Sequence, residues 1–173
     1  MHMNENTSWN NYIRSRCEVY ETIQPNNLEH NLISEANWII RSRCTSCNDL
    51  GITVRTGDIC YMDFGQAYLN EMGYQHFGLI MVLYREKALV VPMTSNAVQY
   101  RSAYDPKTNP HGSKHLLRIG KVPGMNKPSV LFLNDMKFVN TARVIDIKAH
   151  ISTDSALFAI IQERLLKLMM GKM

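Results

Sequence analysis

The sequence lacks an apolar run long enough to cross a bilayer, which takes about 18 consecutive apolar residues. It also lacks the apolar segment behind a basic start that marks a secretory signal, and no internal repeat is visible. These absences argue against a membrane-spanning protein. We therefore expect a cytoplasmic protein with reduced thiols.

Cysteine is also scarce, with four in the chain. Cys44 and Cys47 have the spacing of half a zinc knuckle, but a structural zinc site needs four ligands and no second pair follows. Cys17 and His30 are only loose candidates for the missing ligands. We favour two incidental thiols at the end of a helix, and Cys60, inside an apolar run, as a small apolar filler.

Charge is unevenly distributed along the 173 residues. Residues 1–54 carry four Arg and six acidic residues, a net charge of −2, whereas residues 55–173 carry fifteen Lys and Arg against nine Asp and Glu, a net charge of +6. We predict a helical N-terminal extension over residues 1–54 and a barrel domain over residues 55–173. The basic character belongs to the barrel and is compatible with nucleic acid.

Three apolar, β-prone runs over residues 59–64, 77–84 and 89–93 are bounded by turn and charged residues, which is typical of buried strands in a small antiparallel barrel. Further strands are expected over residues 129–133 and 142–147. Residues 96–128 are predicted to be a long basic loop with one short strand around residues 115–119. A terminal helix over residues 156–169, N-capped within residues 153–155, completes the domain. Its predicted apolar face consists of Ala156, Leu157, Ala159, Ile160, Ile161, Leu165, Leu168 and Met169.

In the extension, residues 28–43 carry apolar side chains at helical spacing, and residues 12–23 have a weaker helical pattern that ends at Pro25. Two such helices cannot form a core of their own, so we expect them to dock on the barrel or on a partner. We favour a role in bracing the barrel. The alternative is that they restrain the binding groove in cis.

Two ordered blocks resemble the MazF/PemK family of toxin endoribonucleases. The first runs from Gly57-Asp58-Ile59 through a polar loop and a strand to Pro92-Met93-Thr94-Ser95, and the second is SVLFLNDMKFVNTARVIDI over residues 129–147. The resemblance covers roughly the last two thirds of the chain. It implies a mainly β, SH3-like barrel with a C-terminal helix, a homodimer, a cognate antitoxin as partner, and cleavage of single-stranded RNA without a cofactor.

RNA can be cut by attack of its own 2′-hydroxyl on the neighbouring phosphorus, leaving a cyclic phosphate and a 5′-hydroxyl. Such an enzyme needs an acid/base and donors for the phosphoryl oxygens. His76 is the candidate acid/base, and it stands where the family has an arginine. Thr94 and Ser95 match the family's threonine-serine pair and would donate to phosphate, and Lys137 would stabilise charge.

The remaining candidates are RNA-binding residues. In the second block, Arg143 and Lys137 could neutralise the charge of a phosphate, and the basic loop contributes further cations. Polar groups and an aromatic ring could contact bases. The full RNA-binding set is Lys137, Arg143, Asn134, Asp135, Tyr74, Arg101 and Lys114.

No metal is expected, because Asp58 and Asp63 would point to opposite faces of one strand. Two other functions remain open. One is a protein-binding module, as in the related gyrase-poisoning toxins, and the other is a homologue that binds RNA without cutting it.

Overall fold

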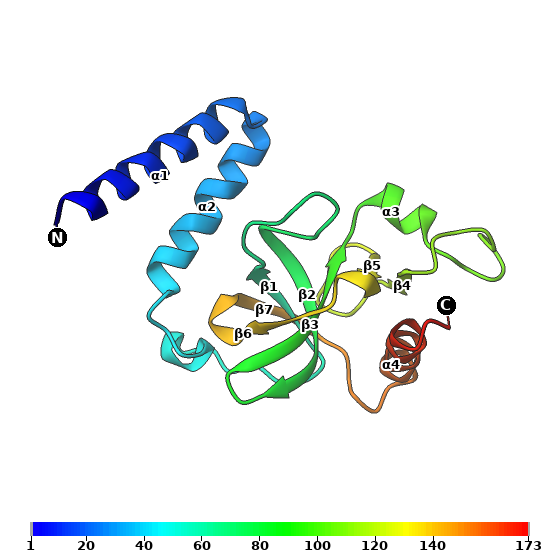
Figure 1. The fold of residues 1–173 in the computed structure, drawn as a ribbon. Coiled ribbons are helices and arrows are strands. Elements are labelled where there is room, and N and C mark those ends of the chain that lie inside the picture. The colour runs from blue at the N-terminus through cyan, green and yellow to red at the C-terminus, as the bar shows by residue number, and fades with distance from the viewer. Residues whose placement is uncertain (1, 173) are drawn as a thin grey trace.

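The computed structural model describes residues 2–172, with the side chains of residues 2–6 and 26 left aside. Two helices, α1 (His2–Thr22) and α2 (Pro25–Arg41), precede an antiparallel sheet, and α4 (Ala156–Met169) ends the chain. The sheet curls into a barrel, with α2 and α4 on different sides of it and α1 projecting outward (Figure 1). The predicted mainly β barrel with helices at both ends is confirmed.

Seven strands form the sheet, in the order β4–β5–β3–β2–β1–β7, and β6 pairs with β3. The predicted strands are present, but the one expected from residue 142 begins only at Val144, after a 3-10 turn, and β6 lies partly in a segment expected to be a turn. Short 3-10 helices η1 (Cys47–Leu50), η2 (Leu133–Asp135) and η3 (Thr141–Arg143) connect the elements. The strands are β1 (Asp58–Asp63), β2 (Gln75–Tyr84), β3 (Lys87–Thr94), β4 (Leu116–Gly120), β5 (Ser129–Phe132), β6 (Lys137–Asn140) and β7 (Val144–His150).

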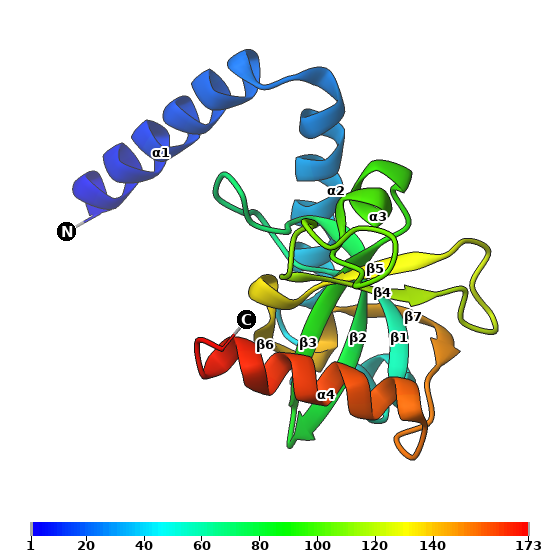
Figure 2. The same cartoon turned by 90° about the vertical axis from the view of Figure 1, so that its right-hand side faces the viewer.

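Successive side chains of a strand point to opposite faces of the sheet, and the apolar ones form a cluster on each face. One contains Cys60, Met62 and Val90, and burial raises the pKa of the Cys60 thiol to about 12, consistent with an apolar filler. The other contains Ile59 and Leu79 and packs against α4, which runs across β1, β2 and β3 in Figure 2. The helix therefore seals the second face.

The contact face of α4 differs from the predicted one. Phe158 was not assigned to that face, yet it is 1% exposed and packs in the core with Ile161 and Leu165. Ile160 and Met169, which were assigned to it, are 48% and 59% exposed. The apolar residues of this helix extend beyond one stripe, so the pattern alone misplaced the centre of the contact.

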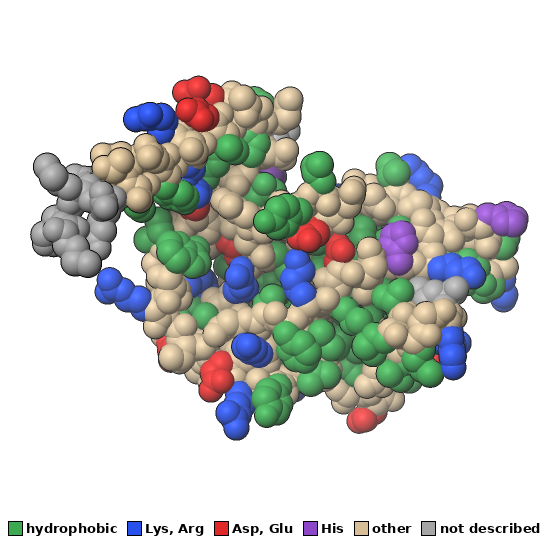
Figure 3. Space-filling model, in the orientation of Figure 1, with side chains coloured by type: hydrophobic (Ala, Val, Ile, Leu, Met, Phe, Trp, Pro, Cys, Tyr) green, Lys and Arg blue, Asp and Glu red, His purple; other side chains and the backbone are tan. Residues whose placement is uncertain are grey.

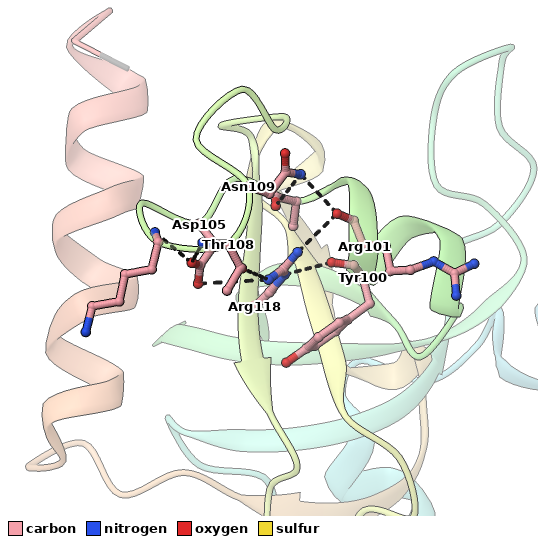
Figure 4. A network of polar contacts seen from close by, with 8 residues as sticks. Tyr100, Arg101, Asp105, Thr108, Asn109 and Arg118 are labelled. Carbon is pink, nitrogen blue, oxygen red and sulfur yellow. Dashed lines mark hydrogen bonds and ion pairs between the residues drawn. The ribbon is translucent and has the colours of Figure 1, made fainter.

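Residues 96–128 are more ordered than the predicted loop. They begin with a short helix, α3 (Ala97–Ser102), which is capped by the Asn96 side chain. Arg118 on β4 then donates to the carbonyls of Tyr100 (2.8 Å) and Arg101 (3.0 Å) and to the hydroxyl of Thr108 (3.0 Å), as Figure 4 shows. This guanidinium holds the segment together with a small apolar cluster of Ala103, Leu116 and Val130.

Helix α2 turns its polar face to the barrel. Ser34 donates to the buried Asp63 carboxylate (2.9 Å), and Arg41 donates to the carbonyls of Ala142 (3.0 Å) and Val144 (2.7 Å). Of the apolar stripe that was expected to mediate docking, Leu28 is half-buried and the other members lie exposed: Leu32, Ile33, Ala36, Ile39 and Ile40. Amphipathicity identified the stripe but not which side of the helix contacts the barrel.

No helix in the described range, residues 2–172, is long and apolar enough to span a membrane.

Candidate functional site

The loop between β1 and β2 organises one mouth of the barrel. Its ends are joined by hydrogen bonds from the Phe64 amide to the Tyr74 carbonyl (2.7 Å) and from the Tyr74 amide to the Gly65 carbonyl (2.6 Å). Tyr74 adopts a φ of 56°, a left-handed conformation that is uncommon for a bulky residue and is often found at functional sites.

Three of the predicted site residues meet at the end of this loop. The Asp135 carboxylate accepts from the Met72 amide (3.0 Å), and the Lys137 ammonium donates to the Met72 carbonyl (3.2 Å). His76 contacts the adjacent carbonyl, with 2.7 Å between its Nδ1 and the oxygen of Gly73. A carboxylate and an ammonium from residues 135–137 therefore meet the imidazole that follows the loop, around two consecutive loop residues.

The environment of His76 defines which nitrogen can take a proton. Since a carbonyl oxygen only accepts, Nδ1 carries the hydrogen, and the lone pair of the neutral ring is on Nε2. Burial lowers the pKa of His76, the bond to Gly73 opposes that shift, and the charge of His30 adds to it. The ring is therefore neutral near pH 7, as a general base must be.

The strand register places Thr94 beside His76. The last pair between β2 and β3 is Phe77 with Met93, so one step further along the register sets His76 opposite Thr94 on the same sheet face. Lys137 pairs with Val90 of β3, an even number of residues from Thr94, and therefore shares that face. The Thr94 hydroxyl accepts from the Asn96 amide (3.2 Å), so its own hydrogen can be donated. Ser95 is exposed next to it.

Solved structures provide the comparison for this arrangement, since no family model and no curated protein matches the sequence. MazF from Deinococcus radiodurans superposes with a TM-score of 0.50 at 14% identity, covering 69% of this chain and 98% of that one. The chain has the MazF fold. An endoribonuclease in complex with its cognate antitoxin from a mycobacterial species matches with a TM-score of 0.47 at 10% identity, covering 69% of this chain and 96% of that one. Mycobacterium tuberculosis toxin MazF-mt6 matches with a TM-score of 0.43 at 12% identity, covering 62% of this chain and 91% of that one.

The Deinococcus match confirms, for the fold, the resemblance to the MazF/PemK family that the sequence showed. The Deinococcus structure is covered almost whole, while nearly a third of this chain lies outside the match. The boundary between extension and barrel at residues 54 and 55 stays a prediction.

The other predicted RNA-binding residues are not part of the contacts at Met72 and Gly73. Arg143 donates to the Asp63 carbonyl (3.1 Å) at the opposite end of the loop. Arg101 is exposed on α3, and its guanidinium points away from the Arg118 network (Figure 4). Lys114 is also exposed, and its carbonyl accepts from Arg164 of α4. Asn134 is exposed on η2, next to the site.

Tyr74 is held by the helical extension. Its hydroxyl accepts from the Asn31 amide (2.8 Å), and its ring stacks on His30 with 5.9 Å between centroids. Its predicted role as a stacking platform for a base stays a prediction. In this conformation one ring face is covered by α2.

Two neighbours of the site were not predicted. The Phe64 ring lies under Lys137, with 5.7 Å from its centroid to Nζ, which favours the cation. His30 from α2 acts electrostatically on His76. The signal for Phe64 was present, since it ends the first apolar run, but nothing in the sequence of α2 indicated that His30 reaches the barrel mouth.

No group of three His, Cys, Asp or Glu side chains within residues 2–172 is arranged to hold a metal ion. Asp58 and Asp63 are both buried and engaged in protein hydrogen bonds. Asp58 accepts from the Arg55 amide (2.9 Å) and lies 2.8 Å from His150 Nδ1, while Asp63 accepts from Ser34.

Proposed function

We propose that this protein is a metal-independent, sequence-selective endoribonuclease that cleaves single-stranded RNA through its 2′-hydroxyl. The observation that carries the proposal is the convergence of His76 and Lys137 on the consecutive carbonyls of Met72 and Gly73, with Thr94 on the same sheet face. The fold shared with a MazF protein supports it.

The proposed reaction uses each group once. Nε2 of His76 takes the proton of the 2′-hydroxyl as that oxygen bonds to the neighbouring phosphorus. The bond from phosphorus to the 5′-oxygen breaks, and this oxygen is protonated through solvent, so the products are a 2′,3′-cyclic phosphate and a 5′-hydroxyl. Lys137 and Thr94 stabilise the charge on the phosphoryl oxygens, with Ser95 as a further donor.

The loop contacts leave these groups free to act. Lys137 uses one ammonium hydrogen on the Met72 carbonyl, and an ammonium has three. His76 uses only Nδ1 on the Gly73 carbonyl. The loop thus orients both side chains without consuming the atoms that the reaction needs.

The direct test is incubation of the purified protein with mixed-sequence RNA and with matched DNA in excess EDTA. We expect RNA fragments with cyclic phosphate and 5′-hydroxyl ends, and intact DNA, because DNA lacks the nucleophile. RNA that is retained but never cut would contradict the enzyme and favour a binding module. Cutting that stops on chelation would contradict metal independence.

The pH dependence of cleavage follows from the lowered pKa of His76. As the base, His76 must be neutral, so activity is low when the ring is protonated and rises with pH through its pKa. We expect the acidic limb of kcat/KM to have its midpoint below the ordinary histidine value of about 6.5. A midpoint clearly above that value in a pH series at constant ionic strength would argue against His76 as the base.

The partners in the proposal are a single-stranded RNA substrate, a second copy of the chain as a homodimer, and a cognate antitoxin. One structural neighbour is an endoribonuclease in complex with its cognate antitoxin.

A further inference from the structure

A cavity of about 500 Å³ separates the helical extension from the barrel. Both helices of the extension line it, α1 through Tyr12 and Arg16 and α2 through Trp38 and Arg41; Figure 1 shows how the two helices are placed. Lys and Arg side chains are spread over the surface between α2 and β6 in Figure 3. Its walls come from α1, α2, the start of the β1–β2 loop and η3, so it exists only because the extension is present.

The polar docking of α2 builds this cavity. α2 presents Ser34, Asn37 and Arg41 to the interior of the cavity and leaves Ile39 and Ile40 outside. Polar side chains around an open space are suited to holding a polar ligand.

The charged groups of the cavity favour an anion. Glu35 is neutralised by Arg16, and Asp63 already accepts from Ser34 (2.9 Å), the Gly65 amide (2.8 Å) and Gln75 (3.2 Å). These contacts leave both carboxylates satisfied.

The remaining cations keep donors for a ligand. Nη1 of Arg41 donates to two carbonyls and Nη1 of Arg143 donates to one. Because a guanidinium has five N–H groups, both side chains keep hydrogens for a ligand. A guanidinium is well matched to a phosphate.

Aromatic rings complete the set. Trp38 of α2 and Tyr12 of α1 line the cavity. Trp38 is 67% exposed and offers its ring to a planar ligand, whereas the Tyr12 ring is in contact with Arg16 and Trp9.

The amide side chains of Asn37 and Gln66 lie on the same walls and can bond to the edges of a base, whereas the Asn140 amide bonds to Thr45 and Ala142. Guanidinium, aromatic and amide groups together match the phosphate and base of a nucleotide. An acidic peptide would leave the tryptophan ring without a partner.

The cavity shares the β1–β2 loop with the proposed cleavage site. Gly65 and Gln66 line it, and they begin the same loop whose other end is held by His76 and Lys137. On β1, Asp63 pairs with Gln75 and Met62 pairs with His76, so the cavity and the imidazole lie at the same end of the β1–β2 pair, on opposite faces of it because successive side chains alternate. The binding path of a single RNA strand would run around this end.

We infer that this cavity is a subsite for one flanking nucleotide of a single-stranded RNA. The subsite rests on the proposed function, since it extends the binding path of the same substrate. Trp38 stacks on the base, and Arg41 and Arg143 contact the phosphate. The helical extension is thus part of the substrate-binding surface.

The test uses the full chain and a mixed-sequence oligonucleotide with 2′-O-methyl groups, which cannot be cut. In a Trp9→Phe variant, Trp38 is the remaining tryptophan of the two in the sequence, and we expect the oligonucleotide to quench its fluorescence. Trp38→Ala should weaken binding about tenfold in fluorescence anisotropy, within the range for loss of one stacked base. Ile40→Ala is the matched control, because Ile40 is 71% exposed on the same helix and outside the cavity.

Equal affinities for the Trp38→Ala and Ile40→Ala proteins would overturn the subsite. So would quenching of Trp38 by hexaglutamate but not by the oligonucleotide, which would indicate a peptide site. If the wild type cuts RNA but Trp38 has no effect on binding, only the subsite fails. If Trp38 governs binding but no RNA is cut, only the proposed cleavage fails.

Discussion

We expect His76→Ala to lose at least 100-fold in RNA cleavage while its fold is unchanged, which corresponds to the contribution of a general base. The ring lies at a strand end and its recorded side-chain hydrogen bond is to the Gly73 carbonyl, so its removal leaves the core intact. The measurement is the single-turnover rate on a defined RNA at pH 7, together with circular dichroism.

His111→Ala is the matched control, because His111 is exposed in the segment beyond α3. We expect this variant to cleave RNA like the wild type. If His76→Ala retains full activity, the imidazole has no part in the chemistry. A loss of equal size in both variants would indicate an effect unrelated to the site.

The second large effect concerns stability. Phe158 of α4 is 1% exposed and packs in the apolar cluster that contains Ile59 and Leu79. Phe158→Ala should therefore lower the free energy of unfolding by about 3–5 kcal/mol. That is a large part of the 5–15 kcal/mol typical of a domain. Urea denaturation followed by circular dichroism measures it.

Ile160→Ala on the same helix should cost less than about 1 kcal/mol, because this side chain is 48% exposed. A similar loss in the two variants would mean that α4 packs on a different face from the one observed. The comparison tests the correction that the structure makes to the predicted apolar stripe.

The strands were predictable because each of the main ones is an apolar run with clear boundaries. β6 was missed since it has only four residues, of which Val139 alone is buried. α3 was missed since prolines further along residues 96–128 argued against a helix anywhere in that segment. Its stability comes from the Asn96 cap and from distant Arg118, a tertiary contact that no local pattern records.

The candidate site was predictable only in part. His76 and Lys137 were named from their places in two motifs, but their convergence depends on β6 pairing with β3 and on the fold of the loop at Met72 and Gly73. The cavity was not foreseen at all. It depends on which side of α2 faces the barrel, and the apolar stripe suggested the opposite side.

The polar attachment of α2 also has a thermodynamic consequence. Contacts such as Ser34 to Asp63 and Arg41 to two carbonyls bury little apolar surface, so releasing the helix costs far less than unfolding the barrel. The helical arm can therefore open as a separate cooperative unit while the sheet stays closed, so its amide protons exchange with solvent earlier than those of β1 and β2.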